Sequence, residues 1–427
     1  YNNPGCYTVK LTVTGPAGSD SKEMCVLVAD NIWYVNGSRG SDINGGTGWS
    51  DAFATIGKAL SVADDYDLVL VADATYNETD LKFNGKKIYL KGVDHNTVGA
   101  TRPVIDCRGK GRGFVFDSGE TKDCVVNNFT IKNGSADRGG AIYCYSSSPT
   151  IVNCAFSSNG ANYYGGAIYC ESGDPTITSC TFNNNSANWD GGAIYCYSSS
   201  SAVSDCTFTH NGAKGSGGAI CYNDKSPMVT NCIFNDNSAG DDGGAIACYS
   251  SSPTIINCTF NGNSAGGDGG AVCCDDSSTP TLTNCTFSDN SAGAGDDGGA
   301  VACYNSSSPT LNNCILWSDS AGSGGNEIYA DSGCTVTLNH CCVDNSAGAY
   351  GGSGTIDDSN NCIFDDPQFV DAAGGDYHLK PTSPCIDAGD NSLIPSSVDK
   401  DLDGNKRIVD GDNNGTATVD IGACEKQ

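Results

Sequence analysis

The sequence predicts an all-β fold, a parallel β-helix in which short strands wind into stacked coils and form a solenoid. The first observation is an internal repeat in which Gly-Gly-Ala returns every 26 residues from Gly139 to Gly269, with a further copy at Gly298. A fixed period in the twenties is typical of solenoids, whose units bury apolar residues only by stacking on their neighbours. The second observation is that each repeat contains short strand-like apolar runs separated by Gly, Ser, Asn and Asp, without the spacing of leucine-rich or helical repeats.

Three apolar positions of the repeat are predicted to form inward-facing stacks at the inter-strand spacing of ~4.8 Å. The first stack is Ile142, Ile168, Ile194, Ile220, Ile246, Val272 and Val301, the second is Phe156, Phe182, Phe208, Phe234, Phe260 and Phe287, and the third is Ile151, Ile177, Val203, Val229, Ile255, Leu282 and Leu311. The glycine pairs are expected to take positive φ at the corner before the first strand. A corner ladder of asparagines is predicted at Asn153, Asn231, Asn257, Asn284 and Asn313, interrupted by Ser179 and Asp205.

The flanking segments are predicted to close the solenoid. Residues 31–65 form an N-terminal cap, whose short helix within residues 51–63 begins after Ser50 or Asp51 and covers the strand edges of the first coil. The β-helix itself spans residues 66–370, and residues 371–427 form a C-terminal cap with an acidic Asp-rich loop. Residues 1–30 alternate as two strands around a Gly-Pro-Ala-Gly turn, which predicts an N-terminal β-hairpin.

The two cysteines of this hairpin are not expected to bond to each other. A turn centred near Ala17 and Gly18 places Cys6 opposite Ala29 and Cys25 opposite Lys10. Because a lone two-stranded hairpin is marginally stable in water, it must pack either on its own β-helix or on another chain. We expect it to add as strands to a second copy, with Cys6 and Cys25 as assembly residues, so the predicted partner is the protein itself in a homopolymer.

The repeat motifs resemble a known family. GGAI or GGAV alternating with FxxN, over roughly Gly139 to Asn290, resembles the repeat of polymorphic outer-membrane proteins, which are surface-displayed right-handed β-helices associated with adhesion. The resemblance implies a right-handed coil and a surface location. It does not imply a membrane anchor, because the end of the chain lacks the alternating segments of a membrane barrel. The runs YVNGSRGSD, DYHLKPTSPCIDAG and VDIGACE resemble secreted bacterial and archaeal β-helix proteins, and residues 1–30 resemble the last strands of a PKD-type immunoglobulin-like domain.

The composition predicts that the protein is located outside the cell, at the cell surface. The chain has 22 Lys and Arg against 50 Asp and Glu, a formal net charge of −28. Such a charge disfavours nucleic acid and anionic membranes as partners and favours cations and counter-charged surfaces. No apolar run is long enough to span a membrane.

The 25 cysteines recur in step with the repeat, one after the first strand and one at the start of the third. No Cys-x-x-Cys pair occurs, so zinc is not expected. Two alternatives remain: ladders of buried thiols, or a disulfide framework of the kind that exported chains use. We expect disulfides, preferably within each coil, although stacked coils also permit bonds between them. The residues are Cys144/Cys154, Cys170/Cys180, Cys196/Cys206, Cys221/Cys232, Cys248/Cys258, Cys274/Cys285 and Cys303/Cys314.

Two further kinds of site are predicted from spacing. Near the C-terminus, four carboxylates and one amide have a spacing similar to the first part of a calcium-binding loop. They are Asp399, Asp401, Asp403, Asn405 and Asp410. The alternative is an acidic turn that is only solvated. No other cofactor is required. Glycan acceptors are expected where sequons fall on turns, at Asn36, Asn77, Asn184 and Asn305, whereas Asn257 and Asn284 are expected to be buried and unmodified.

Function is predicted to be structural rather than catalytic. Between Gly139 and Leu379 the Lys and Arg residues are Lys214 and Lys225 alone. His210 and His340 lie in different repeats without a companion motif. No catalytic cluster is therefore expected, and the chain is predicted not to be an enzyme. We expect an extracellular structural protein that assembles into a filament, sheath or surface layer. The alternative is an adhesin or carbohydrate-binding protein that contacts surface glycans or another cell. Sugar binding would use the turn aromatics Tyr163, Tyr164 and Trp189. A polysaccharide lyase or glycosidase is a third, less favoured, possibility.

Overall fold

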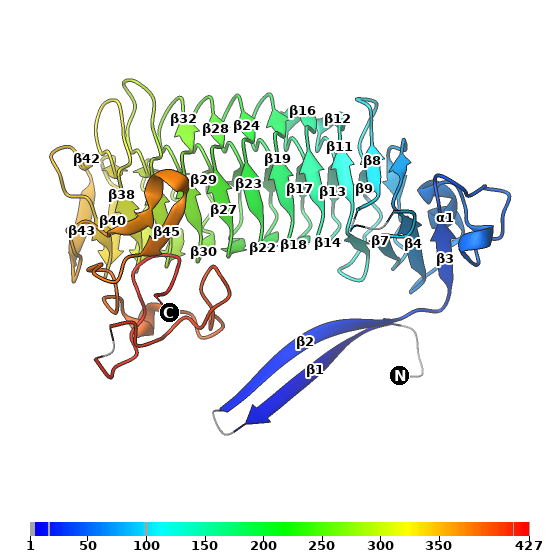
Figure 1. Ribbon diagram of the computed structural model, residues 1–427. Coiled ribbons are helices and arrows are strands. Elements are labelled where there is room, and N and C mark those ends of the chain that lie inside the picture. The colour runs from blue at the N-terminus through cyan, green and yellow to red at the C-terminus, as the bar shows by residue number, and fades with distance from the viewer. Residues whose placement is uncertain (1–4, 16–17, 98, 100, 413, 427) are drawn as a thin grey trace.

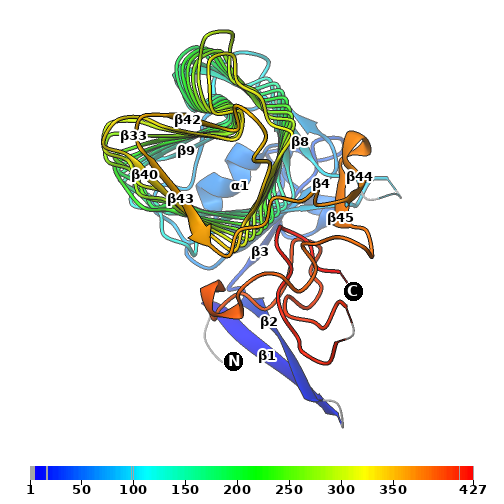
Figure 2. The same ribbon diagram turned by 90° about the vertical axis from the view of Figure 1, so that its left-hand side faces the viewer.

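The computed structural model describes residues 5–15, 18–97, 99, 101–412 and 414–426, and it confirms the predicted parallel β-helix (Figure 1). Parallel strands stack into a sheet of 13 strands, two sheets of 11 strands and a short sheet of 6 strands. Figure 2 looks along the solenoid and shows these sheets as successive sides of one coil, with the core enclosed between them. We refer to them as the first to fourth sheets.

The first sheet contains β3 (Ile32–Val35), β4 (Leu68–Ala72), β7 (Tyr89–Val93), β10 (Val125–Asn127), β14 (Thr150–Val152), β18 (Thr176–Thr178), β22 (Ala202–Ser204), β26 (Met228–Thr230), β30 (Thr254–Ile256), β34 (Thr281–Thr283), β37 (Thr310–Asn312), β40 (Thr335–Asn339) and β43 (Thr355–Asn360). The second contains β5 (Thr75–Tyr76), β8 (Val104–Asp106), β11 (Thr130–Lys132), β15 (Ala155–Ser157), β19 (Thr181–Asn183), β23 (Thr207–Thr209), β27 (Ile233–Asn235), β31 (Thr259–Asn261), β35 (Thr286–Ser288), β38 (Ile315–Trp317) and β41 (Cys342–Val343).

The third sheet contains β6 (Leu81–Lys82), β9 (Phe114–Phe116), β13 (Ile142–Tyr145), β17 (Ile168–Glu171), β21 (Ile194–Tyr197), β25 (Ile220–Asn223), β29 (Ile246–Tyr249), β33 (Val272–Asp275), β36 (Val301–Cys303), β39 (Ile328–Ala330) and β42 (Tyr350–Gly352). The fourth contains β12 (Ser135–Arg138), β16 (Gly160–Tyr164), β20 (Ser186–Ala187), β24 (Gly212–Ala213), β28 (Ser238–Ala239) and β32 (Ser264–Ala265). Beyond the coils, β44 (Phe369–Asp371) pairs antiparallel with β45 (Asp376–Leu379).

The three predicted stacks form the core. The Ile142 stack lies in the third sheet, the Ile151 stack in the first and the Phe156 stack in the second, and all members are fully or almost fully buried. Neighbouring rings along the phenylalanine stack lie almost parallel, with centroids 4.6–4.9 Å apart. The first glycine of each pair has positive φ, as expected, because a Cβ at Gly217 would lie 2.4 Å from the Ile220 carbonyl oxygen.

A second asparagine ladder lies inside the core, at the last position of the FxxN motif. It comprises Asn159, Asn185, Asn211, Asn237, Asn263 and Asn290, all buried. Asn211 is typical: its amide donates to the Phe182 carbonyl and to Asn237 Oδ1, at 3.0 Å each. The ladder thus satisfies buried backbone groups at the turn in each of the coils that carry these six asparagines. This ladder was not predicted, because the FxxN motif was considered only as a mark of the family resemblance.

The corner ladder that was predicted is formed in part. Asn257 donates to Asn231 Oδ1 at 3.1 Å, and Asn231 donates to Asp205 Oδ1 at 3.1 Å, so Asp205 continues the ladder instead of interrupting it. Asn257 and Asn284 are buried, as expected. Both also contact the C-terminal segment, as described below.

The N-terminal helix is shorter than predicted. α1 spans Ile56–Val62 and is capped by Thr55, whose hydroxyl accepts from the Lys58 N–H, whereas Ser50 and Asp51 belong to a separate 3₁₀ turn, η1 (Trp49–Asp51). Thr55 is the N-cap because its side-chain oxygen lies directly before the buried apolar face of the helix, formed by Ile56, Ala59 and Leu60. α1 lies over the open end of the solenoid (Figure 2).

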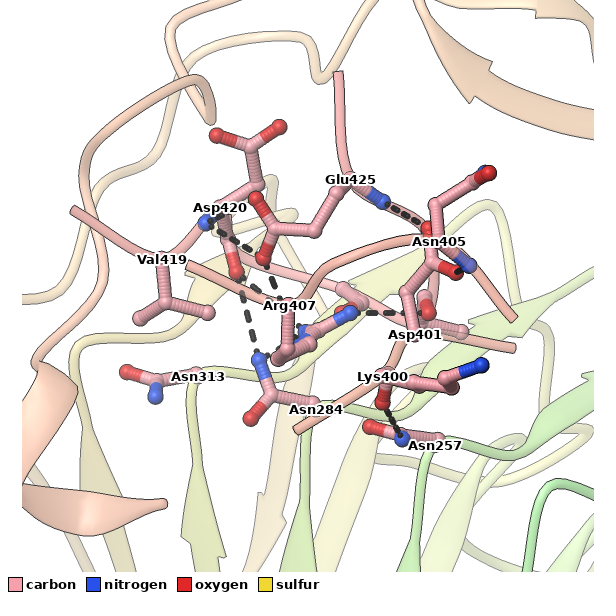
Figure 3. Close-up of polar contacts among 12 residues, drawn as sticks. Asn257, Asn284, Asn313, Lys400, Asp401, Asn405, Arg407, Val419, Asp420 and Glu425 are labelled. Atoms are coloured by element: carbon pink, nitrogen blue, oxygen red, sulfur yellow. Dashed lines mark hydrogen bonds and ion pairs between the residues drawn. The ribbon is translucent and has the colours of Figure 1, made fainter. Parts of the chain in front are cut away.

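The described residues between 371 and 426 do not cover the last coil. They lie along the side of the solenoid, with the 3₁₀ turns η2 (Ala372–Gly374) and η3 (Asn391–Leu393), and contact coils from Asn257 to Cys342 (Figures 1 and 2). The corner asparagines hold this segment: Asn257 donates to the Lys400 carbonyl at 2.7 Å, Asn284 to the Asp420 carbonyl at 3.2 Å and Asn313 to the Asp390 carbonyl at 3.2 Å. Figure 3 shows the contacts of Asn257 with Lys400 and of Asn284 with Asp420.

The N-terminal hairpin consists of β1 (Gly5–Gly15) and β2 (Gly18–Val28). Its register differs by two residues from the prediction, with Cys6 opposite Leu27 and Cys25 opposite Thr8, because pairing continues up to Gly15 and Gly18 at the turn. The two cysteines are still not directly opposed. No helix among the described residues is long and apolar enough to cross a membrane.

Candidate functional site

An aromatic strip lies on the outer side of the third sheet, where the fourth sheet folds over it. Its members are Tyr143, Tyr163, Tyr164, Tyr169, Trp189 and Tyr195. Side chains alternate along a strand, so Ile142 and Cys144 point into the core while Tyr143 points outward. Because adjacent strands are in register, Tyr143, Tyr169 and Tyr195 stack with centroids 5.6 and 5.7 Å apart.

The turn aromatics singled out from the sequence complete this strip. Tyr164 contacts Tyr195 at a centroid distance of 4.4 Å, and Trp189 meets Tyr163 and Tyr164 edge-on at 4.9 and 5.3 Å. Trp189 is 50% exposed and Tyr163 is 41% exposed, so ring faces and edges of the strip are accessible. Tyr169 and Tyr195 lie buried beneath them and fix their positions.

Two arginines and one glutamate border the strip. Arg112 lies over the Tyr143 ring at 5.2 Å, and Arg138 lies over the Tyr169 ring at 5.3 Å. Arg138 is paired with Glu171 at 3.6 Å, and the Tyr169 hydroxyl donates to Glu171 at 2.9 Å. Burial and then the Glu171 charge raise the pKa of Tyr143, so its hydroxyl stays protonated and can donate a hydrogen bond.

This arrangement is suited to a sugar chain. Exposed aromatic rings offer apolar faces with polar edges, and Arg138 and Glu171 add charged donors and acceptors beside them. The sequence analysis selected Tyr163, Tyr164 and Trp189 but not the arginines. Arg112 and Arg138 precede the first regular repeat, and only the stacking of coils brings them to the rings.

The predicted calcium ligands are not brought together. Asp401 is buried and accepts from the N–H groups of Asn405 and Glu425, which makes it part of the C-terminal packing. Asp403 contacts His378, and Asp410 lies with Asp387 and Asp412. The Asp399 carbonyl accepts from the Arg407 N–H at 2.9 Å. The five residues thus take part in separate contacts in this structure, and calcium binding in this region stays a prediction.

The fourteen repeat cysteines are buried free thiols in this structure, so the predicted bonds within coils are not present. Cys144, Cys170 and Cys196 stack in register in the third sheet, and the Cys154 N–H contacts Cys180 Sγ at 3.4 Å in the next coil. The two cysteines of one coil belong to different sides of the solenoid, so cysteines meet between coils instead. Cys221 is the exception, because its register partners are Tyr195 and Ala247. Burial raises the pKa of Cys154 and Cys180 well above its usual value. The side chains of Cys6 and Cys25 lie outside the described part of the structure.

The predicted glycan acceptors divide by exposure. Asn77, Asn184 and Asn305 are exposed. Asn36 is buried and bonds to Asn96 at 3.0 Å, so the prediction of an accessible acceptor there is wrong. Asn36 directly follows β3 and meets Asn96, 60 residues further along the chain, which the sequon alone cannot reveal.

Comparison with known proteins agrees with the fold. The model of the right-handed β-helix region matches residues 84–260 and 214–369. The chain belongs to the right-handed β-helix family. A search among curated proteins finds no match.

Solved structures of β-helix proteins include enzymes. The pectate lyase Pel9A is similar with a TM-score of 0.51 and 13% identity, over 94% of this chain and 97% of that chain. The lacto-N-biosidase from Eubacterium ramulus is similar with a TM-score of 0.47 and 12% identity, over 78% of this chain and 68% of that chain. A rhamnogalacturonan lyase is similar with a TM-score of 0.36 and 13% identity, over 80% of this chain and 90% of that chain. At such identities the likeness concerns the fold alone. The prediction that the chain is not an enzyme does not stand: it rested on the lack of a catalytic cluster between Gly139 and Leu379, whereas the pectate lyase Pel9A shares this fold.

Proposed function

We propose that this β-helix protein works outside the cell and binds a polysaccharide along the aromatic strip. The observation that carries the proposal is the joint presence of accessible rings at Tyr163 and Trp189 and paired charges at Arg138 and Glu171. Between Gly139 and Leu379 the sequence has two lysines, Lys214 and Lys225, and no arginine, so few acidic residues there can have a basic partner from the same stretch. Binding sites for ligands combine apolar surface with a few placed polar groups, and the strip has this composition.

Glu171 is the residue that we propose for chemistry on a bound chain. A carboxylate next to a guanidinium can exchange a proton with a sugar oxygen while the arginine stabilises developing negative charge. Glu171 is held by both Arg138 and the Tyr169 hydroxyl, so its position is fixed before a ligand arrives. If Glu171 acts in this way, the protein cleaves the bound polysaccharide, and measuring this cleavage tests the same site independently of binding.

Replacing Trp189 or Arg138 by alanine is expected to weaken polysaccharide binding at least tenfold, about 1.4 kcal/mol, because stacking area or a charged donor is lost. The measurement is affinity electrophoresis against a panel of neutral and acidic polysaccharides, followed by calorimetry with the best ligand. Met228→Ala is the matched control, since Met228 is 51% exposed on the first sheet, away from the strip. Equal affinities for Trp189→Ala, Met228→Ala and the unaltered protein would refute the strip as the binding site.

Self-assembly is a second candidate, favoured by one specific feature of the hairpin. β1 and β2 extend away from the solenoid in both views (Figures 1 and 2), and Leu11 and Val13 of β1 are 66% and 65% exposed. Apolar side chains on an exposed strand pair favour addition of strands from another copy. We propose that such contacts build a homopolymer.

Removing residues 1–30 is expected to abolish polymers while the solenoid stays folded. The solenoid core, from Val35 to Val343, does not include the hairpin, so its stability does not depend on it. Negative-stain microscopy and light scattering measure the assembly, and far-UV circular dichroism measures the fold. The double substitution Leu11→Ser and Val13→Ser is a milder variant that should lengthen the lag before polymers form. Unchanged polymers from the truncated chain would contradict the proposal.

A further inference from the structure

A histidine, a carboxylate and a thiol meet in the C-terminal segment, far from the aromatic strip. His378 belongs to β45, Asp403 to the turn that follows Asp401, and Cys424 to the end of the chain. One ligand atom from each residue lies within 4.8 Å of the other two. No local spacing connects these residues, because 25 residues separate the first two and 21 the last two. The absence of Cys-x-x-Cys pairs therefore does not bear on this cluster.

The imidazole of His378 is already oriented. Asp376 Oδ1 accepts from the His378 backbone N–H at 3.1 Å and lies 2.5 Å from Nδ1, so this ring nitrogen carries a hydrogen toward the carboxylate. Nε2 then faces Asp403, whose Oδ2 is 2.6 Å away, so a hydrogen lies between these two atoms and leaves to solvent as a proton when a metal ion binds. A carboxylate that fixes one ring nitrogen while the other faces the ligand site is the usual arrangement around metal-binding histidines.

Cys424 and Asp403 are held by backbone contacts on each side. The Leu402 N–H donates to the Ala423 carbonyl at 3.1 Å, and the Glu425 N–H donates to Asp401 Oδ2 at 3.0 Å. The two chain segments therefore run side by side and keep the thiol next to the carboxylate. Cys424 is largely buried, whereas His378 and Asp403 are exposed and can adjust.

The cluster borders a pocket of about 300 Å³ between the C-terminal segment and the outer side of the second sheet. Ile233, Asn235 and Thr259 form the wall contributed by the coils. A ligand bound by the three residues would thus keep one side open to the pocket. Three protein ligands with an open fourth position are typical of reactive zinc sites, and closed sets of four are typical of structural ones.

We propose that His378 Nε2, Asp403 and Cys424 bind one zinc ion, with Asp376 as the positioning residue and the fourth coordination position facing the pocket. Sulfur and imidazole ligands favour zinc over calcium, which requires six to eight oxygen ligands. Two ligands at about 2.0 Å from a tetrahedral ion are about 3.3 Å apart, so Nε2 and Oδ2 must separate by less than 1 Å from their present contact. Since three distant segments share the ion, zinc also fastens the C-terminal segment.

The test uses the full chain, reduced and freed of metal with a chelator. One equivalent of Zn²⁺ is expected to bind and raise the melting temperature, and Co²⁺ in its place should give a thiolate-to-cobalt absorption band. Cys424→Ser should abolish this band and His378→Gln should weaken zinc binding at least 100-fold, whereas Asp376→Ala should weaken it 10–100-fold. Cys362→Ser, a half-buried thiol in another part of the chain, is the matched control and should keep both the band and the affinity.

Circular dichroism of each metal-free variant separates loss of the site from loss of the fold. His378 is exposed, so His378→Gln is expected to fold normally even if Cys424→Ser does not. The proposal is overturned if the unaltered chain binds no equivalent of Zn²⁺, if folded Cys424→Ser retains the cobalt band, or if Cys362→Ser loses as much affinity as His378→Gln.

Discussion

Replacing Arg407 by methionine is expected to lower the free energy of unfolding of the C-terminal segment by about 3–5 kcal/mol. Arg407 is completely buried beside Glu425, with Nε 3.3 Å from Oε1 (Figure 3). Its guanidinium donates to the Ala423 carbonyl at 2.9 Å and to the Gly422 carbonyl. Methionine fills similar volume but removes the guanidinium donor from these two carbonyl oxygens. It also leaves the buried Glu425 carboxyl group without its cation, although the Asp420 N–H still donates to it.

Urea denaturation and hydrogen exchange together measure this loss. Exchange of amides between residues 399 and 426 should accelerate strongly, while those of the phenylalanine stack stay protected. Lys400→Met is the control, because the Lys400 side chain is exposed and only its backbone carbonyl takes part in packing; it should change stability by no more than about 0.5 kcal/mol. The double variant Arg407→Met and Glu425→Leu should recover part of the loss, since an apolar pair can replace a buried ion pair. Equal stabilities of Arg407→Met and Lys400→Met would contradict the assigned role.

The solenoid fold could be predicted from the sequence because the regular coils repeat the same pattern of apolar, glycine and asparagine residues. A position such as Phe208 has equivalents one period away on both sides, so its inward orientation and its stacking partners follow from the period alone. The same logic applies to the thiols: equivalent cysteines stack, whereas cysteines ten residues apart lie on different sides of the coil. The disulfide prediction considered separation along the chain and gave too little weight to register.

The sites could be predicted only in part, because they depend on residues that do not repeat. Tyr163, Tyr164 and Trp189 stand out within their copies, yet the partners Arg112 and Arg138 come from coils before the regular array. The C-terminal contacts are harder still, since Asn284 meets Asp420 across 136 residues. Single long-range contacts of this kind leave no periodic signal. The acidic motif around Asp401 was thus interpreted as a metal loop, although its central carboxylate is buried among backbone donors.

One acidic pair in the core also escaped the sequence analysis and makes stability depend on pH. Asp319 takes the place of the next ladder asparagine, and its Oδ1 accepts from Asn290 N and Nδ2 at 2.7 and 2.8 Å. Glu327 Oε1 accepts from the Asp319 N–H at 3.3 Å. The remaining oxygens, Asp319 Oδ2 and Glu327 Oε2, are buried without a hydrogen-bond donor from the described residues. A single proton shared between the two carboxyl groups satisfies both oxygens.

Glu327→Gln is therefore expected to make the protein progressively more stable than the unaltered chain as the pH rises from 5 to 8. Burial, followed by the charge of Asp319, raises the pKa of Glu327 far above its ordinary value of 4.5. Above pH 4.5 the folded state keeps a proton that the unfolded chain releases, so the free energy of unfolding falls with pH by up to about 1.4 kcal/mol per unit. Glutamine donates to Asp319 through its amide and needs no proton, so this decline should disappear.

Guanidinium denaturation at pH 5, 6, 7 and 8 measures the difference directly. The two proteins should have similar stability near pH 5, where the shared proton costs little to retain, and should diverge by several kcal/mol at pH 8. Asp365→Asn serves as the control, because Asp365 is exposed and its substitution should leave the slope of the unaltered protein unchanged. Parallel pH profiles for Glu327→Gln and the unaltered chain would mean that the two carboxyl groups do not hold a proton in the folded state. The expected divergence would instead identify the end of the asparagine ladder as a place where rising pH weakens the solenoid.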